Sequence, residues 1–144
     1  NPAGLTMVDG PTEATDLDLT ETNRDTVRDF VESVLVRREI EELGRYFDGP
    51  DFIQHNPQSD AGVAALRSTL EARNGSGFMI EYTRLHRVLA EGSFVLAVSE
   101  GSLNGVHSSF YDLYRVSAGK LVEHWDTIEK IPPRSAWKND NGKF

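Results

Sequence analysis

The spacing of hydrophobic residues changes once along the chain, from the period of a helix to that of a strand. In the first half, apolar residues recur at intervals of three and four, which is the stripe of an amphipathic helix. From about residue 79 they alternate with other residues, which predicts strands at about 79–90, 94–103, 106–116 and 120–129. The helical positions are Val27, Phe30, Val31, Val34 and Leu35, then Ile40, Leu43 and Phe47, and then Val63, Leu66 and Leu70.

Helices followed by consecutive antiparallel strands predict an α+β fold, in which a curved sheet wraps onto its own helices. A pocket belongs in the concave space between the two layers. We expect a disordered lead-in over residues 1–21, which are rich in Gly, Pro, Thr and Asp, because they lack any helical or strand period. A folded domain then covers residues 22–130, and an irregular tail covers residues 131–144.

The last predicted hairpin sets two carboxylates and a histidine among apolar and aromatic residues. Alternate residues of a strand share a face, so Val122, His124, Asp126 and Ile128 lie together, as do Phe110, Asp112 and Tyr114 on the partner strand. A three-residue loop with Gly119 in the left-handed conformation is the expected connection. The resulting register pairs Val116 with Lys120, Asp112 with His124, and Phe110 with Asp126.

The two earlier turns decide what else shares that face. A two-residue turn at Asn104–Gly105 pairs Ala97 with Asp112, and the small side chain leaves room above the carboxylate. A two-residue turn at Glu91–Gly92 would then set His86 opposite Ala97. A three-residue loop there would instead turn His86 to the other face, so both arrangements remain open.

Composition narrows the classes of function. The 144 residues suit one domain, and 15 basic against 23 acidic residues give a formal net charge of −8. This charge disfavours nucleic acid and anionic membranes as partners. The absence of cysteine excludes disulfides, thiolate nucleophiles and thiolate metal sites. No apolar run reaches the ~18 residues of a membrane span and no secretory signal is visible, so we expect a cytoplasmic location.

Asp126 is the first candidate for chemistry. It could be an ordinary solvated carboxylate at the end of a strand. If it is instead buried beside Phe110, desolvation raises its pKa, and a carboxylate with a raised pKa suits general acid/base catalysis.

The other candidates surround Asp126. Asp112 could orient His124 and fix its tautomer, or the two could be a buried polar pair that fixes the strand register. His86, His55 and Asn56 could line the pocket together with Ala97, Phe110 and Tyr114. For His55 and Asn56, capping of the loop before Pro57 is an equally good interpretation.

A metal site is a third possibility, because His124 and Asp126 share a face and His86 or Asp112 would supply further ligands. No spacing typical of a metal-binding motif supports it.

Four segments resemble the SnoaL-like branch of the nuclear transport factor 2-like superfamily, which contains polyketide cyclases and predicted aldol-condensation enzymes. The matching segments are Phe52–Pro57, His86–Gly92, Phe110–Arg115 and Gly119–Asp126. The resemblance implies a cone-shaped α+β barrel, often dimeric, that uses no metal or organic cofactor. It matches Asp126 to the general acid/base of the cyclases, Asp112 to a pocket position, and Asn56 to an asparagine near the pocket mouth.

We therefore expect a cofactor-free enzyme that acts by proton abstraction on a small hydrophobic carbonyl compound, as in aldol condensation, cyclisation, isomerisation or dehydration. The alternative is a non-catalytic module of the same fold that binds a small ligand or dimerises. Tyr111, Leu113, Arg115 and Trp125 fall on the opposite sheet face, where they favour a homodimer.

Overall fold

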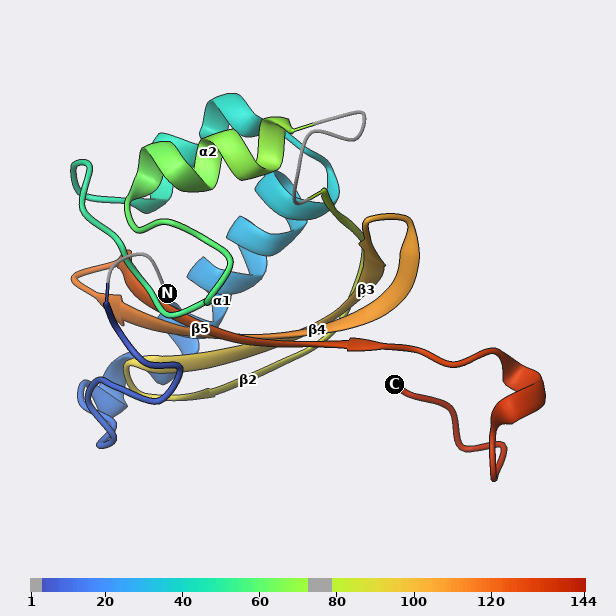
Figure 1. The fold of residues 1–144 in the computed structure, drawn as a ribbon. Coiled ribbons are helices and arrows are strands. Elements are labelled where there is room, and N and C mark those ends of the chain that lie inside the picture. The colour runs from blue at the N-terminus through green and yellow to red at the C-terminus, as the bar shows by residue number, and fades with distance from the viewer. Residues whose placement is uncertain (1–3, 73–78) are drawn as a thin grey trace.

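The computed structural model describes residues 4–72 and 79–144 and confirms the α+β fold. Apart from the short η4 in the C-terminal tail, its helices lie in the first half of the chain, and together they cover one face of a single curved sheet (Figure 1). The helical elements are η1 (Leu17–Leu19), α1 (Thr20–Phe30), η2 (Val31–Val36), η3 (Ile40–Tyr46), α2 (Val63–Glu71) and η4 (Arg134–Ala136). The strands are β1 (Ile53–Gln54), β2 (Ile80–Glu91), β3 (Phe94–Leu103), β4 (Val106–Ser117) and β5 (Lys120–Lys130).

The sheet is mixed, with the strand order β1-β5-β4-β3-β2. The four long strands pair antiparallel, as the alternating pattern predicts. The short β1 was not expected, and it pairs in parallel with β5 so that Gln54 lies beside His124. The chain between η3 and α2 is thereby attached to the edge of the sheet.

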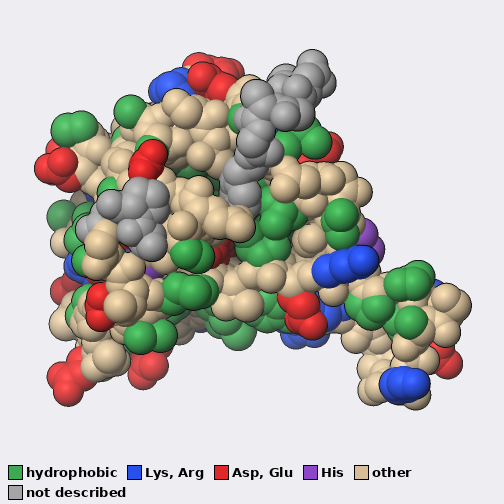
Figure 2. Space-filling view, in the orientation of Figure 1, with side chains coloured by type: hydrophobic (Ala, Val, Ile, Leu, Met, Phe, Trp, Pro, Cys, Tyr) green, Lys and Arg blue, Asp and Glu red, His purple; other side chains and the backbone are tan. Residues whose placement is uncertain are grey.

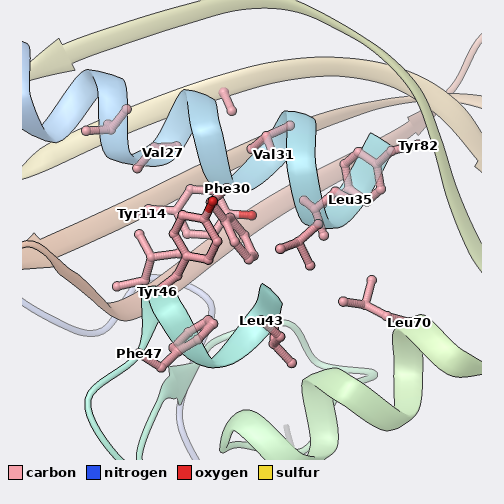
Figure 3. Packing of buried hydrophobic residues seen from close by; sticks show 14 of the residues in the cluster. Val27, Phe30, Val31, Leu35, Leu43, Tyr46, Phe47, Leu70, Tyr82 and Tyr114 are labelled. Carbon is pink, nitrogen blue, oxygen red and sulfur yellow. The ribbon is translucent and has the colours of Figure 1, made fainter. Parts of the chain in front are cut away.

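The helical stripe predicted from the sequence forms the centre of the core. Val27, Phe30 and Val31 are each at most 1% exposed, and α1 continues directly into η2 so that the stripe is unbroken. Figure 3 shows Phe30 against Tyr114 of the sheet and Tyr46 of η3. The ring of Phe30 meets both tyrosine rings edge-on, with its centroid 5.2 Å from that of Tyr46 and 5.7 Å from that of Tyr114. The helices therefore lie fixed on the concave face of the sheet.

The register predicted for the last hairpin is wrong. The connection is a two-residue turn in which both Ala118 and Gly119 have positive φ, and it pairs Ser117 with Lys120. A bulge at Val122 then shifts the pairing, so that Asp112 faces Asp126. Sequence reasoning missed this turn because alanine rarely adopts the left-handed conformation.

The turn and the bulge each shift the pairing of β4 with β5 by one residue, so the register differs from the predicted one by two residues. For this reason, the side chains were still assigned to the correct faces of the sheet. A slide of one residue would exchange the faces, whereas a slide of two preserves them. Asp112, Tyr114, His124 and Asp126 accordingly point into the concave side, where Tyr114 now faces His124. Phe110 faces Ile128 instead of Asp126, and Leu121 replaces Val122 in the core.

The structure decides the facing of His86, which the sequence left open, and the turn expected at Glu91–Gly92 is wrong because Glu91 pairs with Phe94. The turn at Asn104–Gly105 pairs Ala97 with Asp112 as predicted, but Val88 faces Ala97 on the other side. His86 is the extra residue of a bulge in β2, and the bulge turns it to the outer face. There its Nε2 lies 2.9 Å from the carboxylate of Glu100.

Both ends of the described chain contact the outer face of the sheet. The carbonyl of Asp9 accepts a 2.8 Å hydrogen bond from the indole of Trp125, and the carbonyl of Thr15 accepts one of 2.7 Å from the backbone of Ser93. Residues 4–16 are thus attached to the sheet, in contrast to the disordered lead-in expected over residues 1–21. Of that lead-in, residues 1–3 lie outside the described residues.

The C-terminal tail is irregular apart from η4 and extends away from the sheet before it turns back (Figure 1). Its last ring, Phe144, stacks on His86 with centroids 4.0 Å apart. No helix in residues 4–72 or 79–144 combines the length and apolarity needed to cross a membrane.

Gly101 should be essential to the curvature that places Tyr82. The two residues face each other across β3 and β2, and a Cβ at Gly101 would lie 1.9 Å from the carbonyl oxygen of Glu81 and 2.8 Å from the ring of Phe110. Gly101→Ala should lower the free energy of unfolding by about 1–3 kcal/mol. Gly44→Ala, in η3 at a site where the new Cβ would meet no other part of the protein within 4 Å, should not lower it and should raise it by at most about 1 kcal/mol. Equal stability of both variants in urea denaturation would contradict this account.

Candidate active site

A pocket lies between the helices and the concave face of the sheet. Its empty volume is about 460 Å³, a value that includes the open solvent at its mouth. Most of the wall is hydrophobic, and polar groups from β1, the loop after it and β5 gather in one part. No lysine or arginine is among the described lining residues, which are Phe30, Leu35, Phe52, Gln54, Asn56, Ser59, Leu66, Thr69, Leu70, Ile80, Tyr82, Tyr114, His124 and Asp126.

Hydrophobic and acidic side chains are separated on the surface as well. In Figure 2, acidic side chains lie at separate points around the visible face, and hydrophobic side chains reach the surface between the helices and the sheet. On this face, the acidic side chains are therefore dispersed and do not form one patch.

Asp126 is the carboxylate that reaches the pocket. Burial raises its pKa above the ordinary value, the nearby Asp112 adds to the rise, and His124 and a hydrogen bond from Asn56 oppose it. The Asn56 amide donates to Oδ2 over 2.6 Å. Within the described part of the chain, no group donates a hydrogen bond to Oδ1. One oxygen of Asp126 is thus held in place while the other is available.

The loop after β1 fixes the orientation of Asn56. Its Oδ1 accepts a 2.7 Å hydrogen bond from the backbone N–H of Gln58, so its NH2 group is the end that faces Asp126. Asn56 is 6% exposed, and Pro57 holds the backbone before it extended. The position of Asp126 therefore depends on a residue far away in the sequence.

His124 and Asp112 form a buried pair beside Asp126. Nε2 of His124 lies 2.9 Å from Oδ1 of Asp112, and Oδ2 of Asp112 accepts a 3.0 Å hydrogen bond from the hydroxyl of Tyr82. Nδ1 of His124 lies 2.9 Å from Oε1 of Gln54. Asp112 has no exposed surface, so both of its oxygens are satisfied inside the protein.

The Tyr114 hydroxyl is the remaining polar group in this part of the pocket. Burial, together with the nearby carboxylates of Asp112 and Asp126, raises its pKa well above the usual value, so the hydroxyl keeps its proton. It has no hydrogen-bond partner in residues 4–72 or 79–144, although the residue is only 3% exposed. It can therefore donate a hydrogen bond to a molecule in the pocket.

The candidate residues from the sequence separate into three groups. Asp126, His124, Asn56 and Tyr114 line the pocket. Asp112 lies directly behind His124, and Phe110 and Ala97 are completely buried in the core beside it, so they do not line the pocket. His55 and His86 are absent from the lining as well.

His55 belongs to a separate cluster. Its Nε2 lies 2.8 Å from Glu123, which also binds Arg115, and its Nδ1 donates to the carbonyl of Thr6. Its ring stacks on Trp125 with centroids 4.8 Å apart. His55 thus holds the N-terminal segment on the sheet rather than facing a substrate.

Sequence reasoning missed Gln54 and Tyr82. Phe52, Gln54 and Asn56 all line the pocket, as alternate residues of an extended segment should, whereas His55 between them does not. Applying this alternation to the segment would have selected Gln54 together with Asn56 and rejected His55. No pattern in the sequence indicated that Tyr82 would contact Asp112.

Among the described residues, Asp112, His124 and Asp126 have ligand atoms within 4.8 Å of one another, close enough to share one metal ion. Two of the possible ligand atoms already have partners, because Nε2 of His124 bonds to Asp112 and Oδ2 of Asp126 accepts from Asn56. A metal ion would have to replace the bond between His124 and Asp112. The donor set therefore fits a hydrogen-bond network better than a metal site.

The residues expected at a dimer interface do lie on the outer face. Leu113 and Trp125 face each other across β4 and β5, and with Phe94 they line an open apolar hollow. Met7, Val8 and Pro11 of the N-terminal segment form its other side. Lys143 of the tail lies over the ring of Tyr111 at 5.5 Å. The chain itself therefore covers part of this face.

Solved structures with this fold include proteins with several different names. A proposed ketosteroid isomerase from Kribbella flavida is 18% identical, with a TM-score of 0.66 over 87% of this chain and 94% of that one. An LEH-like epoxide hydrolase from M. tuberculosis is 20% identical, with a TM-score of 0.56 over 76% and 84% of the two chains. A proposed polyketide cyclase from Acidithiobacillus ferrooxidans is 16% identical, with a TM-score of 0.55 over 74% and 87%.

These identities establish a shared fold and nothing finer. A search of curated proteins gave no match. A family model described as the SnoaL-like domain matches residues 27–124, which run from the last turn of α1 through η2, η3, α2 and β1 to β4 as far as His124 of β5. The chain therefore belongs to the SnoaL-like domain family and has the nuclear transport factor 2-like fold.

Proposed function

We propose that this protein is a cofactor-free acid/base enzyme that acts on a small, uncharged, hydrophobic carbonyl compound, with Asp126 as the group that moves the proton. The fold family includes structures named as an isomerase, an epoxide hydrolase and a polyketide cyclase, and is compatible with such catalysis. The observation that carries the proposal is Asp126 itself, a pocket carboxylate with one oxygen held by Asn56 and the other available.

Asp126 has the properties of a general base. Oδ1 would take a proton from the carbon next to the substrate carbonyl, and the carboxylic acid so formed would return it to the same or another carbon. A base works best when its pKa is near the working pH, and burial raises the pKa of Asp126 in that direction. Isomerisation, dehydration, cyclisation and aldol condensation all begin with this step.

Loss of the proton places negative charge on the substrate oxygen. The Tyr114 hydroxyl, a donor without a partner among the described residues, would donate a hydrogen bond to this oxygen. A donor directed at developing charge in a site that excludes water contributes about 3 kcal/mol to catalysis. Tyr114 and Asp126 would thus act on the carbonyl and on the neighbouring carbon respectively.

The wall of the pocket favours an uncharged substrate. Its hydrophobic part consists mainly of Phe30, Leu35, Leu66, Leu70 and Ile80. Among the described residues that line the pocket, no lysine or arginine would bind a carboxylate or phosphate beside Asp126. The substrate we propose is therefore apolar apart from its carbonyl.

Proton abstraction can be measured without knowing the natural product. We expect the protein to exchange the protons next to the carbonyl of tetralone or cyclohexenone for deuterium in D2O, followed by proton NMR. Asp126→Asn should reduce this exchange at least ~100-fold, because the amide cannot accept the proton. Asp51→Asn, which changes an exposed carboxylate outside the pocket, should leave it unchanged. Retention of the rate in Asp126→Asn would remove Asp126 from the mechanism.

The titration of Asp126 separates catalysis from ligand binding alone. Burial raises the pKa of Asp126 in the folded state, so folding favours the protonated form. Asp126 therefore lowers the free energy of unfolding as the pH rises from the pKa of the unfolded state to that of the folded state. The free energy of unfolding of Asp126→Asn, relative to that of the wild type, should therefore increase as the pH rises from acidic to neutral. Urea denaturation at each pH measures it. Carbon-13 NMR should show a carboxyl that titrates above the ordinary value. An ordinary value would favour a non-catalytic binding module.

We further propose a homodimer through the outer sheet face, supported by the apolar hollow around Leu113, Trp125 and Phe94. Leu113→Asp should convert the dimer to a monomer in light scattering after size exclusion, because a carboxylate would be buried without a partner. Val106→Asp changes a side chain that is 42% exposed at the tip of a hairpin and should leave the assembly unchanged. A wild-type protein that is already monomeric would refute this interface.

A further inference from the structure

Gln54 has a position in the site that the proposed chemistry does not yet use. It is 5% exposed and pairs with His124 across β1 and β5. Its Oε1 accepts a 3.0 Å hydrogen bond from the backbone N–H of Asn56 and lies 2.9 Å from Nδ1 of His124. Because a backbone N–H can only donate, the atom at this position is the amide oxygen. Nδ1 of His124 must then carry a proton to bond with it.

The second nitrogen of His124 also faces an acceptor. Nε2 lies 2.9 Å from Oδ1 of Asp112, whose Oδ2 already accepts a hydrogen bond from Tyr82. A carboxylate that accepts on both oxygens is satisfied in its ionised form, and a fully buried ion pair is tolerated only when all its hydrogen bonds are made. Gln54, Asp112 and Tyr82 supply all of them. Both nitrogens of His124 are thus placed as donors.

We propose that Gln54 is a positioning residue that keeps a proton on Nδ1 of His124, so that His124 is an imidazolium paired with Asp112 and acts on Asp126 as a fixed positive charge. This role in catalysis rests on the proposed function of Asp126, whereas the location of the protons rests on the geometry alone. These proton positions also give His124 and Asp126 different roles, because His124 offers no free nitrogen to a substrate.

The surroundings of His124 agree with a fixed charge rather than a mobile proton carrier. Its ring lies between Tyr114 and Phe52, with centroids 4.7 and 6.2 Å away. The titratable groups close to it on the concave side are Asp112, Asp126, Tyr82 and Tyr114, and both tyrosines keep their protons. A positive charge here opposes the effect of burial on the pKa of Asp126, so the base remains ionised over a wider pH range.

Nitrogen-15 NMR of the imidazole nitrogens tests the location of the protons without any substrate. In the wild type at neutral pH, both nitrogens of His124 should have the shift of a nitrogen that bears hydrogen. Gln54→Met keeps the length of the side chain but removes the acceptor, and Nδ1 should then lose its proton. Gln54→Glu keeps an acceptor and should preserve the proton. Gln58→Met makes the same change at an exposed position of the nearby loop and should have no effect.

A bare Nδ1 in the wild type would overturn the proposal, and this measurement needs no variant to fold. So would an unchanged His124 spectrum in Gln54→Met.

The effect on Asp126 is measured separately. In Gln54→Met, the carboxyl of Asp126 should titrate at higher pH by carbon-13 NMR, and the acidic side of the pH profile for deuterium exchange into tetralone should move in the same direction. If the nitrogen shifts are as expected but the wild type exchanges no protons, the proposed function fails and the assignment of Gln54 stands. If Nδ1 loses its proton in Gln54→Met and the pH profile of exchange does not move, the charge on His124 has no influence on Asp126.

Discussion

A carboxylate without any exposed surface must find all its partners inside the protein, and Asp112 imposes this requirement on the whole concave face. Its partners come from β2 and β5, as the hydroxyl of Tyr82 and the imidazole of His124. The imidazole in turn contacts Gln54 on β1. Three strands that are distant in the sequence are therefore held in one arrangement by the hydrogen bonds of a single buried group and its nearest partner.

This network leaves Asp126 as the reactive group. His124 and Asp112 satisfy each other, whereas Asp126 receives one hydrogen bond from Asn56 and keeps one oxygen toward the pocket. The two carboxylates face each other across β4 and β5 but have opposite environments. One is enclosed and fully paired, and the other is partly buried and incompletely paired. Such a difference between neighbouring titratable groups is how one site can contain both a structural and a reactive acid.

The pocket and the outer face are separated by the alternation of side chains along β5. His124 and Asp126 point to the concave side, and Glu123 and Trp125 point to the outer side, where they hold the N-terminal segment through His55 and Asp9. Two histidines that looked equally suitable for the pocket, His55 and His86, lie outside it for different reasons. An extended backbone turns His55 away from its neighbours Gln54 and Asn56, and a bulge turns His86 outward.

The local periods of the sequence determined the elements, because helical and strand spacing act over a few residues and do not depend on distant contacts. The stripe from Val27 to Leu35, the four long strands and the inward direction of Asp126 follow from these periods. Only the tertiary structure decided the pairing of those strands. The bulges at Val122 and His86 and the left-handed Ala118 depend on how the sheet curves around the helices, which no local pattern records. The contact between Asn56 and Asp126 was likewise decided by the fold, since it joins segments that meet only when β1 pairs with β5.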